Sequence, residues 1–425
     1  MTKVKKGKLT LEDILVSTEE QPYVIPKNWC WIHLLDSFDN VTDSKKKLMT
    51  KEYLEEGEYP IIDQGQDFIG GYTDDAGMIY DGKLPIVIFG DHTRCIKYID
   101  FQFAQGADGV KVLKPKLFWN DKAFYYALQS IEIPNMGYRR HYPLFKDFCI
   151  PLPPLAEQKR IVAQIESLFS KLDETKEKAQ EVIDGYEARN AAVYNAAFSG
   201  RLTAQWRKNN YKENKWETKR FDEVANIKSN LVDPSDYLDY PHIAPDNIEK
   251  RTGILLDYHT IAEDGVKSGK HRFYAGQILY SKIRPYLSKV VMVDFNGLCS
   301  ADMYPIEAKE NTKYLLYYML SDMFLEQASS AGSRSVLPKI NQKELSAIKV
   351  RITSAEEQEE VVRILDYILP MMQQVRDKAI QVVDNIDTMK KSILAKAFRG
   401  ELETNIPEDE SAIELLKIIL DKGDC

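Results

Sequence analysis

The stretch Pro153-Pro154-Leu155-Ala156-Glu157-Gln158 opens a long helical segment that ends near Phe198-Ser199-Gly200-Arg201-Leu202. A second copy opens at Ser354-Ala355-Glu356-Glu357-Gln358 and ends near Phe398-Arg399-Gly400-Glu401-Leu402. The opening and closing motifs of the two copies are both 200 residues apart, so the copies have equal lengths. A repeat that keeps its length while its interior diverges is typical of a rod.

Apolar residues recur every seven positions in both copies. The recurring positions are Ile165, Leu172, Ala179, Tyr186 and Val193 in the first copy and Leu365, Met372, Ala379, Ile386 and Ile393 in the second. About four heptads of this pattern predict a coiled coil. A helix of about 42 residues is roughly 63 Å long, and its apolar stripe is most simply covered by the other copy, running antiparallel. Pro370 replaces Ser170 of the first copy and predicts a kink or a locally unwound turn.

The chain is therefore predicted to alternate between globular and helical segments. The predicted segments are an N-terminal lead-in (1–25), a first globular domain (26–152), a first long helix (153–202), a linker (203–214), a second globular domain (215–352), a second long helix (353–402) and an acidic tail with a short helix (403–425). The predicted fold class is α+β. Two domains of mixed α/β type are separated by two long helices that form an antiparallel coiled coil, in a pseudo-twofold internal repeat.

The two globular segments share one plan. Short apolar runs separated by Gly- and Asp-rich turns predict strands, and residues 118–131 and 312–325 predict a helix in each domain. Arg94 and Arg284 follow equivalent strands at a constant offset of 190. One frame with two different surfaces indicates two related binding tasks with different targets.

Composition describes a protein with substantial cores and no membrane span. The chain has 425 residues, a net charge of −8 and 44% hydrophobic residues, which argues mildly against a wholly basic nucleic-acid binder. The 5 cysteines are scattered without CxxC spacing, which favours reduced thiols in the cytoplasm over a disulfide frame or a zinc site. The start, Met1-Thr2-Lys3-Val4-Lys5-Lys6, lacks the apolar run of a signal peptide.

Motifs for catalysis are missing from the sequence. It contains no GxxxxGK[ST] phosphate loop and no Asn-Pro-Pro-Tyr or Asp-Pro-Pro-Tyr methyltransferase motif. The 6 histidines lack metal-ligand spacing, so no metal site is expected. Glu174-Thr175-Lys176 resembles the carboxylate-x-Lys of nucleases, but it lies on the predicted coiled coil and is better interpreted as a solvated face.

Basic clusters with aromatic neighbours recur in both globular segments. They are Lys45–Lys47, His92–Arg94 and Tyr138–Tyr142 in the first, and Lys267–Arg272, Ser281–Tyr286 and Ser333–Arg334 with Lys339 in the second. Arg and Lys side chains can neutralise phosphates and read guanine edges. Each cluster alone is more simply a solvated surface, and the recurrence at matching places makes nucleic-acid binding an equal alternative.

The whole pattern resembles the specificity subunits of type I restriction-modification enzymes. The resemblance rests on Leu152–Val162, which is similar to the family's helix opening, on Ala197–Thr203 with Trp206 and Arg207, which is similar to its helix close, and on the Pro-x-x-Trp pattern at Pro26 and Trp29. It covers nearly the whole chain. The second copy departs from the pattern at Thr353-Ser354-Ala355, where the prolines are missing, so that helix start is expected to be looser.

The resemblance implies a non-catalytic protein that supplies the address for other subunits. Each globular domain would be a target recognition domain for one half of a bipartite site in double-stranded DNA, and the helices would set the spacer. Half-sites about one helical turn apart, roughly 34 Å, need two reading domains at fixed separation. Two modification (methyltransferase) subunits would bring S-adenosylmethionine, and restriction subunits, where present, would bring ATP and Mg. The chain itself would need no cofactor.

Candidate site residues follow from matching positions. For DNA contact they are Arg94, Arg139, Arg140, Lys282, Arg284 and Arg334. For the helix ends and the partner-subunit interface they are Pro153, Pro154, Glu157, Gln158, Phe198, Gly200, Glu357, Gln358, Phe398 and Gly400. For the glycines, helix C-caps are the favoured interpretation. Two alternatives stay open: a coiled-coil scaffold that does not bind DNA, and a stand-alone restriction or modification enzyme.

Overall fold

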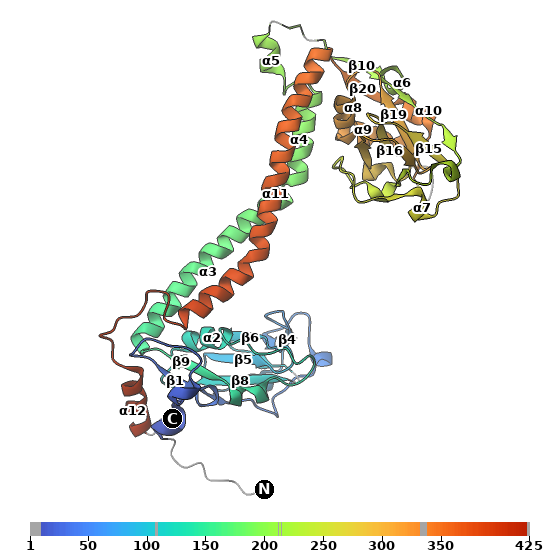
Figure 1. Ribbon diagram of the computed structural model, residues 1–425. Helices are drawn as coiled ribbons and strands as arrows, with labels where there is room; N and C mark the ends of the chain where they lie inside the picture. Colours follow the sequence, from blue (N-terminus) through green and yellow to red (C-terminus); the bar gives the residue numbers. More distant parts are fainter. Residues whose placement is uncertain (1–9, 107–108, 211, 214, 332–337, 423–425) are drawn as a thin grey trace. The chain divides into compact units, whose positions relative to one another are not determined.

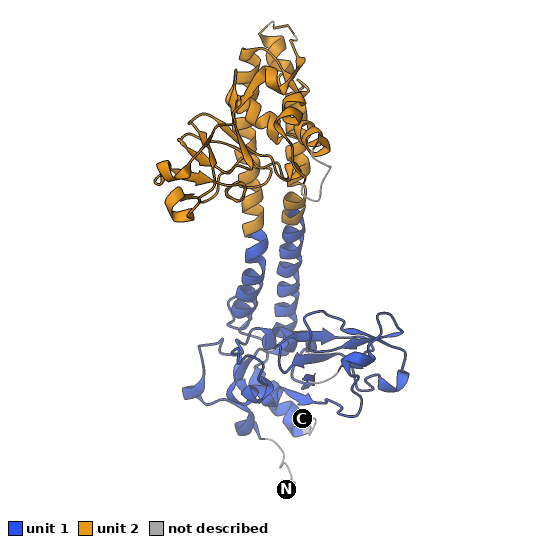
Figure 2. Cartoon of the chain, turned by 90° about the vertical axis from the view of Figure 1, so that its right-hand side faces the viewer, with its two compact units in different colours: residues 1–178, 382–425 blue, residues 179–381 orange. Residues whose placement is uncertain are grey.

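The computed structural model describes residues 10–106, 109–210, 212–213, 215–331 and 338–422. The chain divides into two compact units (Figure 2): unit 1 comprises residues 1–178 and 382–425, and unit 2 comprises residues 179–381. Each unit contains one globular domain and a part of both long helices. The units are described one at a time.

Unit 1 begins with a short helix and then forms a mainly β domain (Figure 1). Its strands are β1 (Cys30–His33), β2 (Phe38–Asn40), β3 (Tyr59–Ile62), β4 (Gly71–Thr73), β5 (Ile86–Gly90), β6 (Ile96–Ile99), β7 (Ala104–Gln105), β8 (Val110–Pro115) and β9 (Cys149–Leu152). Its helices are α1 (Leu11–Ile14), α2 (Asp121–Gln129), most of α3 (Leu155–Asp184) and α12 (Ala412–Lys422), with 3-10 turns η1 (Thr18–Glu20), η2 (Leu34–Asp36), η3 (Thr50–Glu52), η4 (Ala76–Met78) and η5 (Tyr142–Asp147).

A four-stranded antiparallel sheet, β2-β8-β5-β6, is the centre of this domain. Its strand β5 is buried on both faces: Val87 and Phe89 join the core beneath α2, and Ile86 and Ile88 join a second cluster. Burial on both faces explains why the sequence here is a continuous apolar run instead of an alternating one. A smaller sheet, β4-β3-β7, contains the parallel pair β3 and β7.

Unit 2 contains the second domain and the other parts of the long helices. Its strands are β10 (Glu217–Arg220), β11 (Ala225–Ile227), β12 (Leu231–Val232), β13 (Pro241–Ile243), β14 (His259–Thr260), β15 (Lys270–Phe273), β16 (Ile278–Ser281), β17 (Val290–Met292), β18 (Gly297–Cys299), β19 (Met303–Ala308) and β20 (Lys349–Ile352). Its helices are α4 (Tyr186–Phe198), α5 (Ala204–Asn209), α6 (Phe221–Val224), α7 (Ile261–Asp264), α8 (Thr312–Leu320), α9 (Asp322–Ala331), α10 (Gln342–Ala347) and much of α11 (Ala355–Ala397), with 3-10 turns η6 (Pro234–Tyr237), η7 (Pro245–Asn247) and η8 (Pro285–Leu287).

The second domain repeats the sheet order of the first. Its central sheet runs β11-β19-β16-β17, which matches β2-β8-β5-β6. The two-stranded pair β10 and β20 matches β1 and β9, so in each domain the first strand pairs with the last. The parallel pair β13 and β18 likewise matches β3 and β7. The internal repeat predicted from scattered anchors is therefore a repeat of topology.

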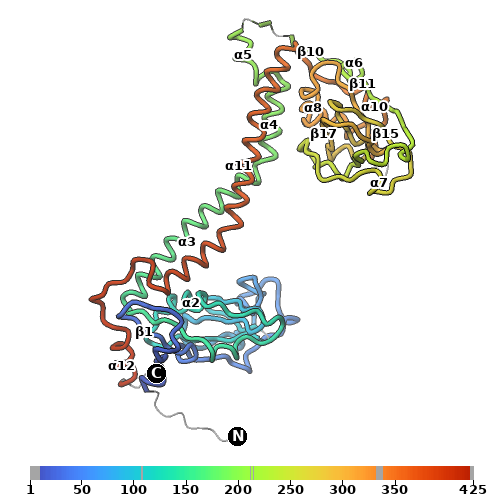
Figure 3. The backbone as a smooth tube through the Cα atoms, viewed as in Figure 1, coloured from blue at the N-terminus to red at the C-terminus, as the bar shows by residue number. Residues whose placement is uncertain are grey.

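The long helices lie side by side and antiparallel within each unit (Figure 3). In unit 1, Glu157 contacts Thr404 and Asp173 contacts Lys390, so the partner position falls as the first helix advances. In unit 2 the same order holds, because Tyr186 contacts Gln373 and Thr203 contacts Glu357. The predicted fold class, two α/β domains with a pair of antiparallel long helices, is confirmed.

Two predicted helices are interrupted. The first long helix breaks at Gly185, between α3 and α4, where glycine has little intrinsic helix preference. The guanidinium of Arg189, in α4, donates to the carbonyl of Val182, in α3, and so joins the two helices across the break. The helix predicted over 312–325 divides at Ser321, whose hydroxyl donates to the carbonyl of Tyr318 at 2.6 Å and ends α8.

Of the two outcomes predicted at Pro370, the locally unwound turn is wrong, since α11 runs through the proline without interruption, and the kink stays a prediction. The turn before the proline is fixed by domain contacts. The carboxylate of Asp366 accepts the hydroxyl of Tyr317 at 2.5 Å and the ammonium of Lys313 at 2.8 Å. Tertiary packing therefore outweighs the lost backbone hydrogen bond.

The apolar residues that recur three positions after the heptad positions of α11 form a second row, which stays exposed. Leu365, Ala379 and Ile386 are buried. Val375, Val382 and Met389 of the second row are 50%, 38% and 48% exposed. A pair of helices covers one row and leaves the other at the surface.

Candidate nucleic-acid interface

In the first domain the loop between β5 and β6 presents Arg94 from a left-handed backbone with φ of +63°. Residues other than glycine rarely adopt this region, and such strain concentrates at functional sites. The backbone N–H of Arg94 donates to the carbonyl of Gly90 at 2.8 Å, which closes the turn. The Arg94 guanidinium donates to the carbonyl of Ile133 at 2.9 Å, so this side chain ties the loop to a second loop, residues 131–142.

A buried histidine fixes these two loops together. His141 is fully buried, and its Nδ1 and its backbone N–H both lie 2.8 Å from the carbonyl of Asp91. Its Nε2 accepts the N–H of Met136 at 3.1 Å. The ring is therefore the neutral tautomer with a proton on Nδ1, and it joins both loops without charge. The structure thus brings together two basic clusters that are far apart in sequence.

The tip of the second loop is exposed. Tyr138 is 88% exposed, and Arg139 and Arg140 are also exposed. The ring of Tyr138 stacks on His92 with centroids 4.9 Å apart and an interplanar angle of 17°. Cations beside an exposed aromatic ring are the combination that contacts phosphates and bases.

The second domain presents Arg284 at the equivalent position, between β16 and β17. Its φ is +48°, again left-handed, and its side chain is exposed. The backbone N–H of Arg284 donates to the carbonyl of Pro338 at 2.7 Å, and Ile283 pairs with Lys339. The loop therefore rests on the same kind of second segment as in the first domain. Arg334 lies outside the described residues.

Lys282 lies half-buried beside Arg284. Its ammonium is 5.1 Å from the centre of the Tyr304 ring. Burial, with a smaller contribution from the nearby Lys339, lowers the pKa of Lys282. Lys339 itself pairs with Asp302 at 2.9 Å. An anion placed here would meet the Lys282 ammonium beside the ion pair of Lys339 with Asp302.

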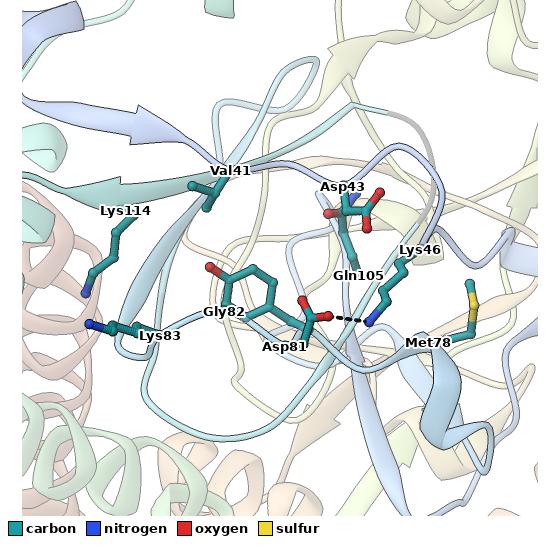
Figure 4. A pocket seen from close by; sticks show the side chains of 10 residues that line it. Val41, Asp43, Lys46, Met78, Asp81, Gly82, Lys83, Gln105 and Lys114 are labelled. Atoms are coloured by element: carbon teal, nitrogen blue, oxygen red, sulfur yellow. Dashed lines mark hydrogen bonds and ion pairs between the residues drawn. The ribbon is translucent and has the colours of Figure 1, made fainter.

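Other predicted clusters are not part of these loop pairs. Lys46 pairs with Asp81 at 2.9 Å and lines a separate cavity of about 400 Å³, with Lys83 and Lys114 on its other side (Figure 4). In the cluster 267–272, Lys270 and His271 are buried. Burial, together with the charge of Lys282, lowers the pKa of His271.

The repeated helix openings form an internal junction in each unit. In unit 1 the fully buried carboxylate of Glu157 accepts the indole N–H of Trp29 at 2.6 Å, the amide of Asn405 at 2.7 Å and the hydroxyl of Thr404 at 3.2 Å. Gln158, also buried, donates to the carbonyls of Phe118 and Pro153 and accepts the N–H of Asn120. The start of one helix is thereby joined to the first domain and to the segment after the other helix.

Unit 2 repeats this junction around Glu357, which is 1% exposed. Its carboxylate accepts the indole N–H of Trp216 at 3.0 Å, the hydroxyls of Thr203 and Thr353 at 2.5 and 2.8 Å, and the guanidinium of Arg207. Gln358 donates to the carbonyl of Thr353 at 2.8 Å. Thr353 thus occupies a defined place although the Pro-Pro pair is absent here.

The helix closes contribute a glycine and a phenylalanine to these junctions. Gly200 and Gly400 have φ of +79° and +75° after the last helical turn, as C-cap glycines do. A Cβ on Gly400 would lie 2.5 Å from Cγ of Pro26. Phe198 and Phe398 are buried in the core of unit 2 and unit 1 respectively. The prolines Pro153 and Pro154 are buried as well.

Within the described ranges the structure provides no metal site, because no group of three or more His, Cys, Asp or Glu side chains is arranged to hold an ion. No helix in the described part of the chain combines the length and apolar content needed to cross a bilayer.

Residues 26–183 and 213–380 match the type I restriction modification DNA specificity domain. The chain belongs to this family. The Escherichia coli type I restriction enzyme EcoDI specificity subunit is 41% identical over 278 residues, which are 60% of this chain and 63% of that protein. The Escherichia coli EcoBI specificity subunit is 26% identical over 318 residues, 67% of this chain and 66% of that protein. Both matches span less than two thirds of the relative's length.

Solved structures share the fold of this specificity-family chain. The HsdS subunit from Thermoanaerobacter tengcongensis aligns with 90% of this chain and 100% of its own, with a TM-score of 0.59 and 16% sequence identity. At this identity the likeness concerns the fold alone.

Several functional residues of this specificity-family chain were not singled out from the sequence. Thr404 and Asn405 bind Glu157 although they are more than 100 residues away in the chain. Arg207 was named only as part of the helix close, and the structure shows that it binds Glu357. The signal that could have found them is the repeated combination of Trp, Glu-Gln and Thr around each helix end. His141 was predicted as part of a basic surface cluster, whereas it is buried and joins the two loops by hydrogen bonds.

Proposed function

We propose that this chain is the sequence-specific DNA-recognition subunit of a type I restriction-modification enzyme and carries no catalysis itself. Each globular domain reads one half of a bipartite target. The observation that carries the proposal is the matched pair Arg94 and Arg284, both left-handed and both at the loop after the equivalent central strand. Strain retained at the same place in two divergent domains supports a shared binding task.

The proposed domain division follows the sequence repeat. Residues 26–152 and 215–352 are target recognition domains, and residues 153–202 and 353–402 are the spacer helices. The lead-in (1–25) and the tail (403–425) belong with the first domain, which is supported by the burial of Ala412 and Leu416 in its core. The linker 203–214 begins in unit 2 as the tail begins in unit 1. Thr203 donates to Glu357, and Thr404 donates to Glu157 in the same way.

The DNA-contacting residues are proposed to act in two ways. Arg139, Arg140 and Arg284 are exposed and would contact phosphates or guanine edges. Arg94 and Lys282 are half-buried. They would contact DNA from the base of the loops, behind the exposed residues. Arg334, which is outside the described residues, stays a candidate by its position in the sequence. Because the chain as a whole has a net charge of −8, DNA would be attracted by these local basic groups and not by the overall charge.

Two modification subunits carrying S-adenosylmethionine are the proposed partners, with restriction subunits carrying ATP and Mg where they exist. The exposed row Val375, Val382 and Met389 supports a docking role for the helices, because exposed apolar rows mark interaction sites. The buried helix-end residues, including Glu157, Gln158, Glu357 and Gln358, support this interface indirectly by fixing where each helix begins. Since the substrate is DNA, we place the protein in the cytoplasm.

The test uses the chain assembled with its modification subunits. Genomic DNA is methylated with S-adenosylmethionine, and the methylated adenines are mapped. We expect one bipartite motif with a fixed spacer. Insertion of four residues after Glu177 should change the spacer and leave both half-sites intact.

Three results would contradict the proposal. Methylation by the chain without partners would show a stand-alone enzyme. Absence of any sequence-selective methylation would favour a scaffold that does not bind DNA. An unchanged spacer after the insertion would remove the measuring role of the helices.

A further inference from the structure

The stack of the half-buried His92 on the exposed Tyr138 points to how the first domain reads a base, and this inference rests on the proposed function. The His92 ring projects from the β5–β6 loop and lies against Tyr138, which is 88% exposed. The Nδ1 of His92 lies 3.1 Å from the carbonyl of Tyr138. Because a carbonyl only accepts, Nδ1 must donate, and in the neutral ring Nε2 is left as an acceptor.

The loop at His92 is held by two hydrogen bonds to Gln64, one to its side chain and one to its backbone. The Oε1 of Gln64 accepts the N–H of His92 at 3.1 Å, and the Gln64 carbonyl accepts the Thr93 hydroxyl at 2.6 Å. A Cβ on Gly109 would lie 2.5 Å from the Oε1 of Gln64, so only glycine leaves room for the Gln64 side chain to bond His92. A pre-positioned side chain is what discrimination between base pairs requires.

Arg94 is less available for reading than its position in the sequence predicts. Its guanidinium is engaged by the carbonyl of Ile133 and connects the two loops. Arg139 and Arg140 are exposed at the tip and carry no fixed contact to a described residue, which suits phosphate contact. Among the side chains of the two loops, His92 combines a fixed orientation with an acceptor that bonds no described residue.

We propose that His92 is a base-reading residue of the first domain and that Tyr138 is its positioning residue. The Nε2 of His92 accepts a hydrogen bond from an exocyclic amino group in the major groove, which only adenine (N6) and cytosine (N4) offer there. At the strand position that faces His92, adenine or cytosine is therefore preferred over thymine or guanine.

The second domain has the opposite hydrogen-bonding character at the same place. Lys282 lies two residues before Arg284, as His92 lies two residues before Arg94. An ammonium only donates, so it suits the guanine O6 and N7 or the thymine O4 acceptors. The two half-sites thus differ at the base pair beneath this loop position.

The test maps adenine methylation by the assembled enzyme on a pool of randomised DNA. His92→Phe keeps an aromatic ring against Tyr138 and removes the acceptor. We expect one position of one half-site to lose its preference about 2- to 12-fold, the worth of a single hydrogen bond, with the other half-site and the spacer unchanged. His92→Lys should move that position toward guanine or thymine. His259→Phe, at an exposed histidine of the second domain, is the matched control and should leave the first half-site intact.

Tyr138 is tested by two variants. Tyr138→Phe keeps the stack and the carbonyl and should retain the wild-type motif, whereas Tyr138→Ala should loosen the same position that His92→Phe loosens. A loosened position elsewhere in the motif would overturn the positioning role.

The remaining outcomes separate the inference from the proposed function. An unchanged motif in His92→Phe overturns the inference while the proposed function stands. Absence of selective methylation by the wild-type enzyme overturns the proposed function. If His92→Phe abolishes methylation, an unchanged melting temperature supports a DNA contact, and a melting temperature lowered by several degrees assigns His92 a structural role and overturns the inference.

Discussion

At the Glu157 junction a buried carboxylate receives three neutral donors, from Trp29, Thr404 and Asn405. At the Glu357 junction the equivalent carboxylate also meets the guanidinium of Arg207, whose side chain is 14% exposed. Unit 1 has its arginine one step outward, where Arg160 bonds the carbonyl of Thr404 and pairs with Asp409. The repeated Glu-Gln motif therefore fixes the position of the buried carboxylate in both units. The residues that surround the carboxylate and offset its charge differ between the units.

The largest difference between the junctions should come from removing the carboxylate. Glu357→Ala removes the only carboxylate paired with the Arg207 guanidinium in the described residues and leaves it the neutral acceptors Gly200 and Thr203, which costs about 3–5 kcal/mol. Glu157→Ala leaves only neutral donors unpaired, at about 1–3 kcal/mol. Hydrogen exchange of the amides in each unit, measured against denaturant, reports the two losses separately.

The control for this pair is Glu356→Ala, because Glu356 is 62% exposed and its ion pair with Lys212 is at the surface. It should cost no more than about 1 kcal/mol. Equal losses in Glu357→Ala and Glu157→Ala would mean that Arg207 does not distinguish the junctions.

A second comparison concerns Ser170 and Pro370, which occupy equivalent positions in the two helices. Ser170→Pro should destabilise unit 1 by about 3 kcal/mol, because proline removes a backbone hydrogen bond and clashes with the preceding turn. That turn is joined to the first domain by the ion pair of Glu166 with Lys122, whereas Asp366 accepts the hydroxyl of Tyr317 as well as the ammonium of Lys313. Thermal unfolding monitored by helical circular dichroism measures the loss. Ser170→Ala is the control and should not destabilise, since alanine favours the helix. A harmless Ser170→Pro would show that both helices tolerate interruption at this level.

The two C-cap glycines should give smaller and similar effects. Gly400→Ala and Gly200→Ala place a side chain on left-handed backbone, which costs about 1–2 kcal/mol, and each new Cβ also meets a ring, at 2.5 Å from Pro26 and 2.8 Å from Trp216 respectively. Gly265→Ala has the same backbone strain with nothing within 4 Å of its Cβ, so it isolates the conformational cost. Urea unfolding midpoints measure all three. If Gly265→Ala cost as much as the others, the contacts with the domain would have no energetic role.

The repeat and the fold class could be predicted because they depend on local patterns. Heptads predict long helices, and a buried run such as 84–89 predicts a central strand. The continuity at Pro370 could not be predicted, since it depends on contacts such as Tyr317 with Asp366 that only the folded domain supplies. The break at Gly185 was missed for another reason, because the heptad pattern continues through this residue despite the low helix propensity of glycine. Helix propensity is a weak guide where tertiary packing decides.

The sequence predicted which positions of the two domains correspond. It predicted less well what the side chains at those positions contact. Arg94 and Arg284 share an offset, and both prove to be left-handed. The sequence does not reveal that the Arg94 guanidinium binds Ile133, because the carbonyl it uses belongs to an irregular loop. Nor does it reveal that His141 is buried, since a histidine between arginine and tyrosine is more simply a surface residue.

The smallest expected difference between the units is their response to acid. The hydrogen bond from His242, at 2.6 Å, and then that from His259 lower the pKa of Asp264 in unit 2. A depressed carboxyl pKa stabilises the fold above the ordinary value of 3.8, and the contribution is lost as the pH falls through the lower folded pKa. Asp264→Asn should therefore be less stable than the wild type at pH 5, and the gap should close by about pH 2.

Unit 1 offers the matched group for this measurement. A hydrogen bond from Lys46 lowers the pKa of Asp81, but that carboxylate is 81% exposed, so solvent screens the interaction. Asp81→Asn should show a smaller gap at pH 5 than Asp264→Asn, although both gaps close in the same direction. Urea unfolding of each variant at pH 5 and pH 2 makes the comparison. A larger gap for Asp81→Asn would mean that screening does not decide the difference, and that the half-buried His242 pair stabilises unit 2 less than its geometry indicates.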